Sequence, residues 1–387
     1  MNQTYYLDHC GSTPMSARVK QFLKETIDED LFGNSMASHH VAGRLAFMKI
    51  EQARAEAAEL LGLKDSKSVI FTGSATEANN LVINGFWLRF RDRGCRVLYS
   101  AIEHKSALES CQRIATFAGC QAHEIPIDSN GNVDLDVLKT HLKDNPKRLP
   151  TLVVMMHTNN EIPVRFPVES ISELCQEHRA YFHCDAVQGI VRERIQVDKQ
   201  SYGSLVISPH KFYGPKGVGI LCLSDQSTCT PLAPFIIGGD QEFGMRPGTL
   251  NTHGILASID ALKELDETRA NLVKHMTSCQ NAFISTLQAS PKFHRTIPTS
   301  HHAPGIVNFY LENWDALTLL SKLSKTCINR GASCTGAGGE KFSHVPRALG
   351  LPLEIQANVL RASFGWGCSV ENAVEAAREI LDICRNK

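Results

Sequence analysis

The chain has 387 residues with 40 basic and 40 acidic side chains, so its formal net charge is zero. This length exceeds the roughly 250 to 300 residues at which single cores usually stop growing, so two domains that share a cleft are expected. The even charge balance lacks the electrostatic pattern of a nucleic-acid or membrane-surface binder. A small molecule or another protein is therefore the expected partner.

The amino-terminal stretch MNQTYYLDHC has no basic region followed by an apolar run. No apolar stretch approaches the roughly 18 residues needed to span a bilayer, so a soluble cytoplasmic protein with no membrane partner is expected. The 13 cysteines are scattered without a C-x-x-C pair, so we expect neither a metal site nor a disulfide framework. Most of these cysteines are expected to be small buried apolar residues.

Short apolar runs alternate with amphipathic segments from residue 68 to residue 223. The runs are rich in β-branched residues and end in small or polar residues, which predicts buried strands. The segments between them carry apolar residues at helical spacing. This alternation predicts an α/β fold with a mainly parallel sheet and ligands at the carboxyl ends of its strands. Strands are expected at 68–72, 95–100, 151–156, 180–185, 204–208 and 217–223, and helices at 75–90 and 167–180.

The pattern changes after about residue 265, where a long helical segment leads into a mixture of strands and helices. We expect a smaller α+β domain that is joined through the long helix. Residues 16–265 are assigned to the large domain, and residues 1–15 and 266–387 to the small domain. The long joining helix is expected at 260–289, and the small domain is expected to contain helices at 314–323 and 370–384 and strands at 305–311 and 359–366.

The stretch SPHKFYGPKG places Lys211 directly after an expected strand, beside glycines that admit close backbone approach. Asp185 ends another expected strand upstream, in HCDAVQ. A lysine that forms a Schiff base and an acid that keeps a pyridine nitrogen protonated are what pyridoxal phosphate requires from its protein. Alone, Lys211 would be a surface lysine and Asp185 a helix N-cap, but the pair favours a cofactor site.

A phosphate site is expected in FTGSATEANN, where a strand, a Gly-Ser turn and a helix start follow one another. Free backbone N–H groups and the positive end of the helix dipole bind anions at such a position, and Ser74 and Thr76 add hydroxyls. His104 follows the strand CRVLYS, which predicts a position at the same edge of the sheet. A histidine at a helix start with no further role is the alternative.

One cysteine, Cys334, lies in the glycine-rich stretch NRGASCTGAGG at 329–339. Glycines on both sides of it favour a compliant loop rather than a core segment. An ordinary surface turn with an inert thiol is the alternative. Cys327, only seven residues upstream, is expected in a strand.

These stretches, in this order, resemble the class V aminotransferase-like enzymes of fold type I, which use pyridoxal phosphate. Within that group they resemble the cysteine desulfurases and selenocysteine lyases. The resemblance implies a large domain with a mainly parallel seven-stranded sheet, a smaller α+β carboxyl-terminal domain, and pyridoxal 5'-phosphate as the cofactor. It covers nearly the whole chain and is carried by YYLDHCGSTP, GSATEANN, EHKSA, TNNEIPV, HCDAVQ, SPHKFYGPKG, GMRPGTLNT, GASCT and VLRASFGW.

The resemblance also implies a role for each matching residue. Lys211 would bind the cofactor covalently and take the Cα proton of the substrate, and Cys334, in a mobile loop at about 329–342, would accept sulfur. Arg361 would bind the substrate carboxylate through its planar fork. The implied cofactor contacts are Ala75, Thr76, Ser208 and His210 at the phosphate, His104 over the ring and as a proton shuttle, Asp185 at the pyridine nitrogen, Asn160 (also near the substrate) and Gln188 at the phenolic oxygen, and Thr249 at the phosphate of the other subunit of a homodimer.

The implied reaction converts L-cysteine to L-alanine and leaves a persulfide on the enzyme for a sulfur-acceptor or scaffold protein, as in iron–sulfur cluster assembly. The alternatives are a selenocysteine lyase acting on L-selenocysteine, another class V enzyme with Cys334 as a bystander, and a non-enzymatic binding module. The chain departs from the family pattern at 9–12, where Cys10 is a candidate second thiol, and at Asp240, Phe243 and Trp366. These departures leave the choice between cysteine and selenocysteine open.

Overall fold

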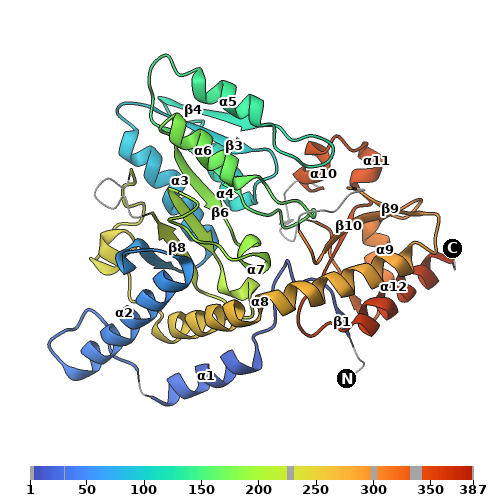
Figure 1. Ribbon diagram of the computed structural model, residues 1–387, viewed down its shortest axis with the longest axis horizontal. Coiled ribbons are helices and arrows are strands. Elements are labelled where there is room, and N and C mark those ends of the chain that lie inside the picture. The colour runs from blue at the N-terminus through green and yellow to red at the C-terminus, as the bar shows by residue number, and fades with distance from the viewer. Residues whose placement is uncertain (1–3, 30, 225–230, 298–302, 332–341, 386–387) are drawn as a thin grey trace.

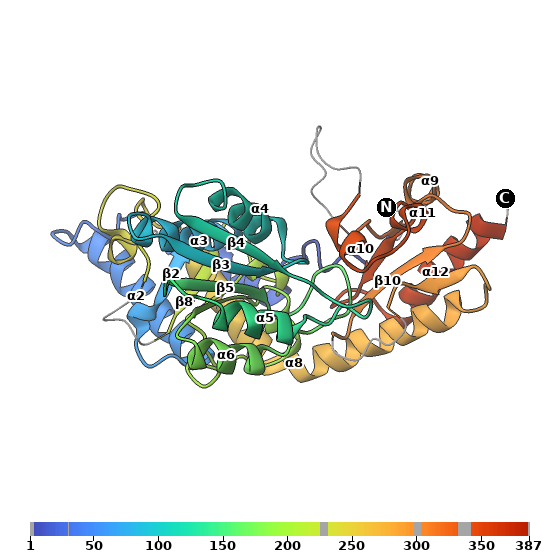
Figure 2. The same ribbon diagram turned by 90° about the horizontal axis from the view of Figure 1, so that it is seen from above.

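Two lobes joined by one long helix make up the molecule (Figure 1, Figure 2). The computed structural model describes residues 4–29, 31–224, 231–297, 303–331 and 342–385. The joining helix, α8 (Thr252–Leu287), has 36 residues and begins after the N-cap Asn251. At 1.5 Å per residue it is about 54 Å long, which is enough to contribute to both lobes.

The large lobe is built on a seven-stranded sheet with the order β2-β8-β7-β6-β5-β3-β4. β8 runs antiparallel to both of its neighbours, and the other adjacent pairs are parallel. The predicted α/β class, the mainly parallel sheet and its seven strands are confirmed. The strands are β2 (Val69–Thr72), β3 (Cys95–Ser100), β4 (Cys120–Ile125), β5 (Thr151–Met156), β6 (Tyr181–Asp185), β7 (Ser204–Ile207) and β8 (Gly219–Leu223).

Two apolar cores, one on each face of this sheet, hold the large lobe together. α3 (Ala75–Phe90) and α4 (Lys105–Ile114) cover one face, and their buried side chains form a cluster with residues such as Val97 and Leu221. α5 (Leu135–Lys143), α6 (Val168–Glu177) and part of α8 lie on the other face (Figure 2). The expected strands are found because their side chains are buried on both faces.

The strand β4 was not predicted from the sequence. It lies at the edge of the sheet, and Gln121 and Glu124 are exposed, so no apolar run marks it. Edge strands face solvent on one side and tolerate polar residues.

The small lobe contains a three-stranded antiparallel sheet and a parallel two-stranded one. The amino-terminal strand of the chain contributes to the second of these, because β1 pairs with β11. The proposed boundary at 265/266 falls inside α8, which continues without a break. The elements are β9 (Phe293–Arg295), β10 (Ile306–Leu311), β12 (Leu360–Ser363), β1 (Tyr5–Tyr6), β11 (Thr326–Cys327), α9 (Ala316–Lys322), α10 (His344–Ala348), α11 (Leu353–Gln356) and α12 (Val370–Arg385).

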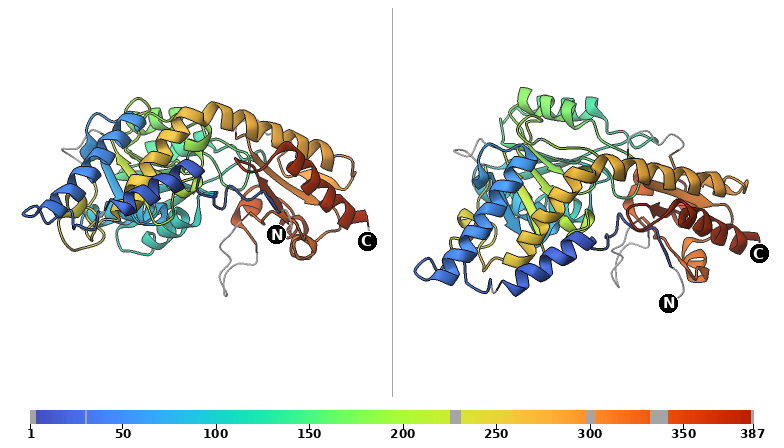
Figure 3. Two further views of the ribbon diagram at one scale, coloured as in Figure 1. Left: turned by 90° about the horizontal axis from the view of Figure 1, so that it is seen from below. Right: turned by 60° about the horizontal axis from the view of Figure 1, so that its bottom comes forward.

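Two amino-terminal helices, α1 (Ala17–Asp28) and α2 (Val41–Leu61), pack against α8 (Figure 3). α2 buries one face but leaves Val41, Phe47 and Met48 at least half exposed on another. Exposed apolar side chains of this size are typical of a surface that a partner covers. In the described ranges, no helix combines the length and the apolar character that crossing a membrane requires.

Candidate active site

A cavity of about 300 Å³ lies at the carboxyl-terminal edge of the large sheet. Its wall includes the last residues of β5 and β6, Met156 and Asp185, and Ser208 directly after β7. Open α/β sheets present their ligands at this edge. Ten of the residues that the sequence predicts for the site line this one cavity: Ala75, Thr76, His104, Asn160, Asp185, Gln188, Ser208, His210, Lys211 and Arg361.

Lys211 reaches the cavity from a short 3-10 helix, η2 (Pro209–Lys211), that follows β7. Its Nζ donates hydrogen bonds to the carbonyl oxygens of Cys10 and Gly11, both at 2.7 Å. Burial lowers the pKa of Lys211, because the ammonium form is poorly solvated there. An amine with a lowered pKa is available as a nucleophile and as a base.

Asp185 is held by two donors at the end of β6. Its Oδ2 accepts from Asn79 Nδ2 at 3.0 Å, and its Oδ1 accepts from the backbone N–H of Val187 at 3.1 Å. Asn79 Oδ1 in turn lies 2.9 Å from Nε2 of His183, whose pKa is lowered by burial to about 3. His183 is therefore neutral and donates to Asn79, which fixes the amide so that its N–H faces Asp185. Asn79 was not predicted, although it lies in the motif GSATEANN.

His104 is coupled to the same asparagine through one serine. Nδ1 of His104 lies 2.8 Å from Ser106 Oγ, which accepts from Asn79 Nδ2 at 2.9 Å. The backbone N–H of Ser106 also donates to Nδ1 at 3.2 Å, so Nδ1 is an acceptor, the Ser106 hydroxyl donates to it, and the ring carries its proton on Nε2. Burial lowers the pKa of His104 from its ordinary value. The result is a neutral imidazole whose orientation is fixed from the side of Asp185.

Glu103, next to His104 in the chain, is a fully buried acid. Its Oε1 accepts from Ser100 Oγ at 2.5 Å and from the N–H of Met156 at 2.8 Å. Burial raises the pKa of Glu103 to about 8, so the side chain is protonated at neutral pH. Its backbone carbonyl also accepts from His344 Nε2 at 2.9 Å, which ties α10 of the small lobe to the site.

The start of α3 forms the anion-binding end of the cavity. Ser74 caps the helix by accepting from the N–H of Glu77, and Ala75 and Thr76 are its first two residues. A side chain at position 219 would lie 2.4 Å from the backbone of Ser74, so Gly219 lets this turn lie against β8. Backbone N–H groups at the start of a 16-residue helix bind phosphate well.

His210 lines the same cavity as the start of α3. Its Nδ1 is 3.1 Å from Ser12 Oγ, and burial lowers the pKa of His210 to about 4. The ring is therefore neutral at pH 7 and acts as a hydrogen-bonding group rather than as a cation. Ser12, one of the residues that departs from the family pattern, thus places its hydroxyl next to His210, which is predicted to bind the phosphate.

Arg361, on β12 of the small lobe, is almost fully buried. Its Nη1 donates to the carbonyls of Asn160 at 2.8 Å and Gly331 at 3.1 Å, and its Nη2 pairs with Asp8 Oδ1 at 2.5 Å. Burial opposes its charge, but Cys10 and Asp8 raise the pKa of Arg361 overall. Among the described residues, Nε has no hydrogen-bond partner. This arrangement leaves two of the five N–H groups of the guanidinium, the one on Nε and one on Nη2, for a ligand carboxylate.

Glu161, which also lines the cavity, contacts both described ends of the segment that contains Cys334. Its Oε2 accepts from Ser343 Oγ at 2.7 Å, and a Cβ at Gly331 would lie 1.9 Å from the same oxygen. Position 331 therefore has room only for glycine while Glu161 stays in place. Cys334 itself lies outside the described residues.

Thr249 and most of the departures from the family pattern lie away from this cavity. Thr249 is exposed and does not line the cavity of its own chain. The backbone N–H of Trp366 donates to Tyr213 Oη at 2.7 Å, and the indole stacks on His275. Cys10 and Gly11 are the exceptions, because both line the cavity, where Cys10 is buried.

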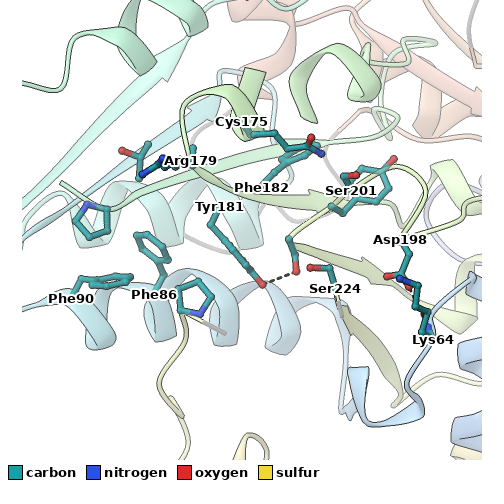
Figure 4. A pocket seen from close by; sticks show the side chains of 17 residues that line it. Lys64, Phe86, Phe90, Cys175, Arg179, Tyr181, Phe182, Asp198, Ser201 and Ser224 are labelled. Carbon is teal, nitrogen blue, oxygen red and sulfur yellow. Dashed lines mark hydrogen bonds between the residues drawn. The ribbon is translucent and has the colours of Figure 1, made fainter. Parts of the chain in front are cut away.

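A second hollow, of about 760 Å³, lies at the opposite edge of the large sheet (Figure 4). Its lining includes Phe86 and Phe90 at the end of α3 and Tyr181 at the start of β6. Tyr181 Oη donates to the carbonyl of Gly203 at 2.7 Å. None of the predicted site residues is among its described lining residues. It is therefore not the place where the predicted chemistry is assembled.

The chemical groups that line the first cavity are suited to bind pyridoxal phosphate. A partly buried amine with a lowered pKa, that of Lys211, lies in the same cavity as the carboxylate of Asp185 and the imidazole of His104. The start of α3 supplies anion-binding N–H groups to this cavity. These are the groups needed for a Schiff base, for a protonated ring nitrogen, for a stacked ring and for a phosphate, respectively.

The family model described as Aminotransferase class-V matches residues 5–375. A protein of Dictyoglomus turgidum named cysteine desulfurase IscS is 33% identical over 373 residues, which are 94% of this chain and 90% of the relative. A solved NifS-like protein is 27% identical with a TM-score of 0.90 and full coverage of both chains. A structure of SspA in complex with cysteine is 29% identical with a TM-score of 0.81, covering 94% of this chain and 99% of the other.

These matches extend over nearly the whole chain, and residues from seven of the nine motifs that carry the resemblance line one cavity at the expected edge of the sheet. The chain is therefore an enzyme of the aminotransferase class-V family, in its cysteine desulfurase group.

Proposed function

We propose that this enzyme is a cysteine desulfurase that depends on pyridoxal phosphate. It converts L-cysteine to L-alanine and retains the sulfur on Cys334 as a persulfide. The observation that carries the proposal is the partly buried Lys211 in one cavity with Asp185, His104 and Arg361. The similarity to proteins named as cysteine desulfurases supports it.

Lys211, Asp185, His104 and the start of α3 would hold the cofactor, with Ser208 and His210 beside its phosphate and Gln188 beside its phenolic oxygen. When bound, the cofactor withdraws electrons from the substrate Cα and stabilises negative charge there. The Lys211 amine, whose pKa burial lowers, removes and returns a proton at Nζ. The neutral His104 passes a proton through Nε2.

Arg361 would bind the substrate carboxylate with the guanidinium donors that remain beside Asp8. Asn160, whose carbonyl accepts from Arg361, would border the substrate at the same point. Because Asp8 already balances the positive charge, the substrate carboxylate must share Nη2 with it or take the Nε edge. Asp8 thereby limits the site to ligands that bind tightly enough to compete.

The sulfur would move from substrate to enzyme in one transfer. The Cys334 sulfur attacks the substrate sulfur, an S–S bond forms, and the C–S bond of the substrate breaks. The carbon that loses sulfur gains a proton, so alanine leaves and the persulfide remains. Glu161 contacts Gly331 and Ser343 on either side of this segment, so it would hold both ends of the segment at the cavity.

A homodimer is also proposed, with Thr249 reaching the phosphate site of the other subunit. Large apolar side chains of α2 and its surroundings are exposed in the single chain, including Phe32 at 81%, Val41 at 71% and Ile237 at 85%. A second copy that covers them would remove this apolar surface from water. Light scattering should report twice the mass of the chain, and Val41→Asp should shift it toward the monomer.

The proposal is tested by measuring alanine formation from L-cysteine and from L-selenocysteine, together with intact-mass analysis for added sulfur. Cys334→Ser should abolish alanine formation from L-cysteine and remove the added sulfur. Cys327→Ser, which alters an exposed cysteine seven residues upstream, is the matched control and should change neither. Full activity of Cys334→Ser on L-cysteine would reject the persulfide step. A clear preference for L-selenocysteine would identify a selenocysteine lyase instead.

A further inference from the structure

Cys95 and Cys120 lie side by side at the edge of the large sheet. They are the first residues of β3 and β4 and are direct partners in the parallel register of these strands. Their sulfur atoms are 3.5 Å apart. Neighbouring strands are about 4.8 Å apart, which lies within the range of about 4.4 to 6.8 Å between Cα atoms that a disulfide can bridge. Small side-chain rotations are therefore enough to join the two sulfurs.

The backbone holds the two cysteines in this register independently of their side chains. Each follows a glycine with positive φ, +87° at Gly94 and +80° at Gly119. A Cβ on Gly94 would lie 2.8 Å from the carbonyl oxygen of Gly119, so the two turns pack directly on each other. That same oxygen accepts from the N–H of Cys95 at 3.1 Å. The backbone of the two strands, and not a chance orientation of two flexible side chains, therefore brings the two cysteines together.

The two thiols differ in reactivity. Cys95 is buried, whereas Cys120 is partly exposed. The Cys95 thiol donates to the sulfur of Cys120, which lowers the pKa of Cys120 and raises that of Cys95. Because the thiolate is the nucleophile, the sulfur of Cys120 reacts first with an oxidant. Cys95 is positioned to attack the oxidised sulfur of Cys120 and form the disulfide.

We propose that Cys95 and Cys120 are a redox modification site that closes to an intramolecular disulfide on exposure to a hydroperoxide. The Cys120 sulfur attacks a peroxide oxygen, the O–O bond breaks, and water or an alcohol leaves with formation of a sulfenic acid. The Cys95 sulfur then attacks the sulfenic sulfur, an S–S bond forms, and water leaves. The two thiols lose two electrons in total, and the peroxide gains them.

The disulfide would act on the stability of the sheet edge and not on the chemistry of the cavity. In the described part of the chain β4 pairs only with β3, so the bond would fasten the outermost strand. The two cysteines lie at the amino-terminal ends of these six-residue strands, about 20 Å from the edge that carries the cavity. The bond would also close a covalent ring that contains α4 and His104. This inference does not depend on the proposed function.

The test is peptide mapping of the full-length holoenzyme after treatment with hydrogen peroxide. Remaining thiols are alkylated, and the protein is digested with trypsin without reduction. Tryptic cleavage separates the relevant cysteines, because Cys95 falls in residues 94–96, Cys111 in 106–113 and Cys120 in 114–139. The expected product joins 94–96 to 114–139, has lost two hydrogens and disappears on reduction. The Tm of the oxidised protein should rise and should return to its former value with a thiol reductant.

Cys120→Ser should abolish both the linked peptide and the change in Tm, and Cys95→Ala provides a second variant if the first folds poorly. Cys327→Ser, an exposed cysteine on another sheet, is the matched control and should retain both. A link between 106–113 and 114–139 would overturn the proposal. So would an unlinked, further oxidised Cys120, or two thiols that both stay free under peroxide.

Discussion

Replacing Asn79 by aspartate should make the stability of the folded protein strongly dependent on pH. Asn79 has no exposed surface, and its Nδ2 donates to Asp185 Oδ2 at 3.0 Å. The substitution keeps the size of the side chain but places a second carboxylate where the donor was. Two carboxylates at this distance are expected to keep one proton between them.

The magnitude follows from the distance between Asn79 Nδ2 and Asp185 Oδ2. Two unit charges 3.0 Å apart repel by about 5 kcal/mol at an effective dielectric constant of about 20, which corresponds to about 4 pKa units. One carboxyl of the pair would therefore titrate near pH 8 when folded and near pH 4 when unfolded. Within this window the folded state holds the extra proton, so the variant loses up to about 1.4 kcal/mol per pH unit as the pH rises.

Urea unfolding of the cofactor-free protein measures this loss. Relative to wild type, Asn79→Asp should lose about 2 to 3 kcal/mol of unfolding free energy between pH 5 and pH 7. The loss should vanish when Asp185→Asn is added, because the cycle removes the repulsion. Asn84→Asp is the control, since Asn84 is buried on the same helix and donates to Asn80 and Ser110 rather than to an acid. A difference that does not change with pH would refute the reasoning.

Bound pyridoxal phosphate links this prediction to the proposed function. A protonated ring nitrogen against Asp185 would supply a positive charge and relieve the repulsion between the two carboxylates. The pH-dependent loss in Asn79→Asp should therefore become smaller when the protein is loaded with the cofactor. An equal loss with and without the cofactor would contradict the assignment of Asp185.

Three further substitutions test other parts of the structure. Glu242→Gln should lower the unfolding free energy by about 3 kcal/mol. The buried Arg54 guanidinium donates to both carboxylate oxygens of Glu242 at 2.7 Å and would lose its negatively charged partner. An unchanged urea midpoint would contradict this prediction. Arg361→Lys should raise the KM for L-cysteine about tenfold or more while affecting kcat less, because an ammonium group cannot make the paired hydrogen bonds of a guanidinium. An unchanged KM in steady-state kinetics would contradict the binding of the substrate carboxylate by Arg361. Wild type should lose stability relative to Glu103→Gln as the pH rises from about 4 to 8. The folded-state pKa of Glu103 is raised to about 8, so in this range the folded protein keeps a proton that the unfolded chain releases. The same difference in urea midpoint between the two proteins at pH 5 and at pH 8 would contradict this prediction.

The fold of the large lobe could be predicted where burial on both faces of the sheet leaves a continuous apolar run. β5, at 151–156, is such a run, and all of its residues are buried. β4 could not be predicted, because an edge strand is specified by its neighbour and not by its own composition. The start of α8 at Thr252 was also missed, since Gly254 interrupts the helical pattern and only packing within the large lobe compensates for it.

The candidate site was predictable where a residue directly follows a strand, as Lys211 and Asp185 do. The residues that hold them in place were not, because their contacts join distant parts of the chain. Asn79 meets Asp185 across 106 positions, and Asp8 meets Arg361 across 353. The roles of the individual residues, the homodimer and the cytoplasmic location stay predictions.

Helix α8 fixes the position of the two lobes relative to each other. It supplies Leu262 to the core of the large lobe and Phe283 to the core of the small lobe, so neither lobe can tilt without bending a continuous helix or opening its own core. The span between the Lys211 amine and the Arg361 guanidinium is therefore built into the scaffold. If these two residues bind substrate as proposed, we expect the enzyme to select ligands by the separation of their amino and carboxylate groups more than by their side chains.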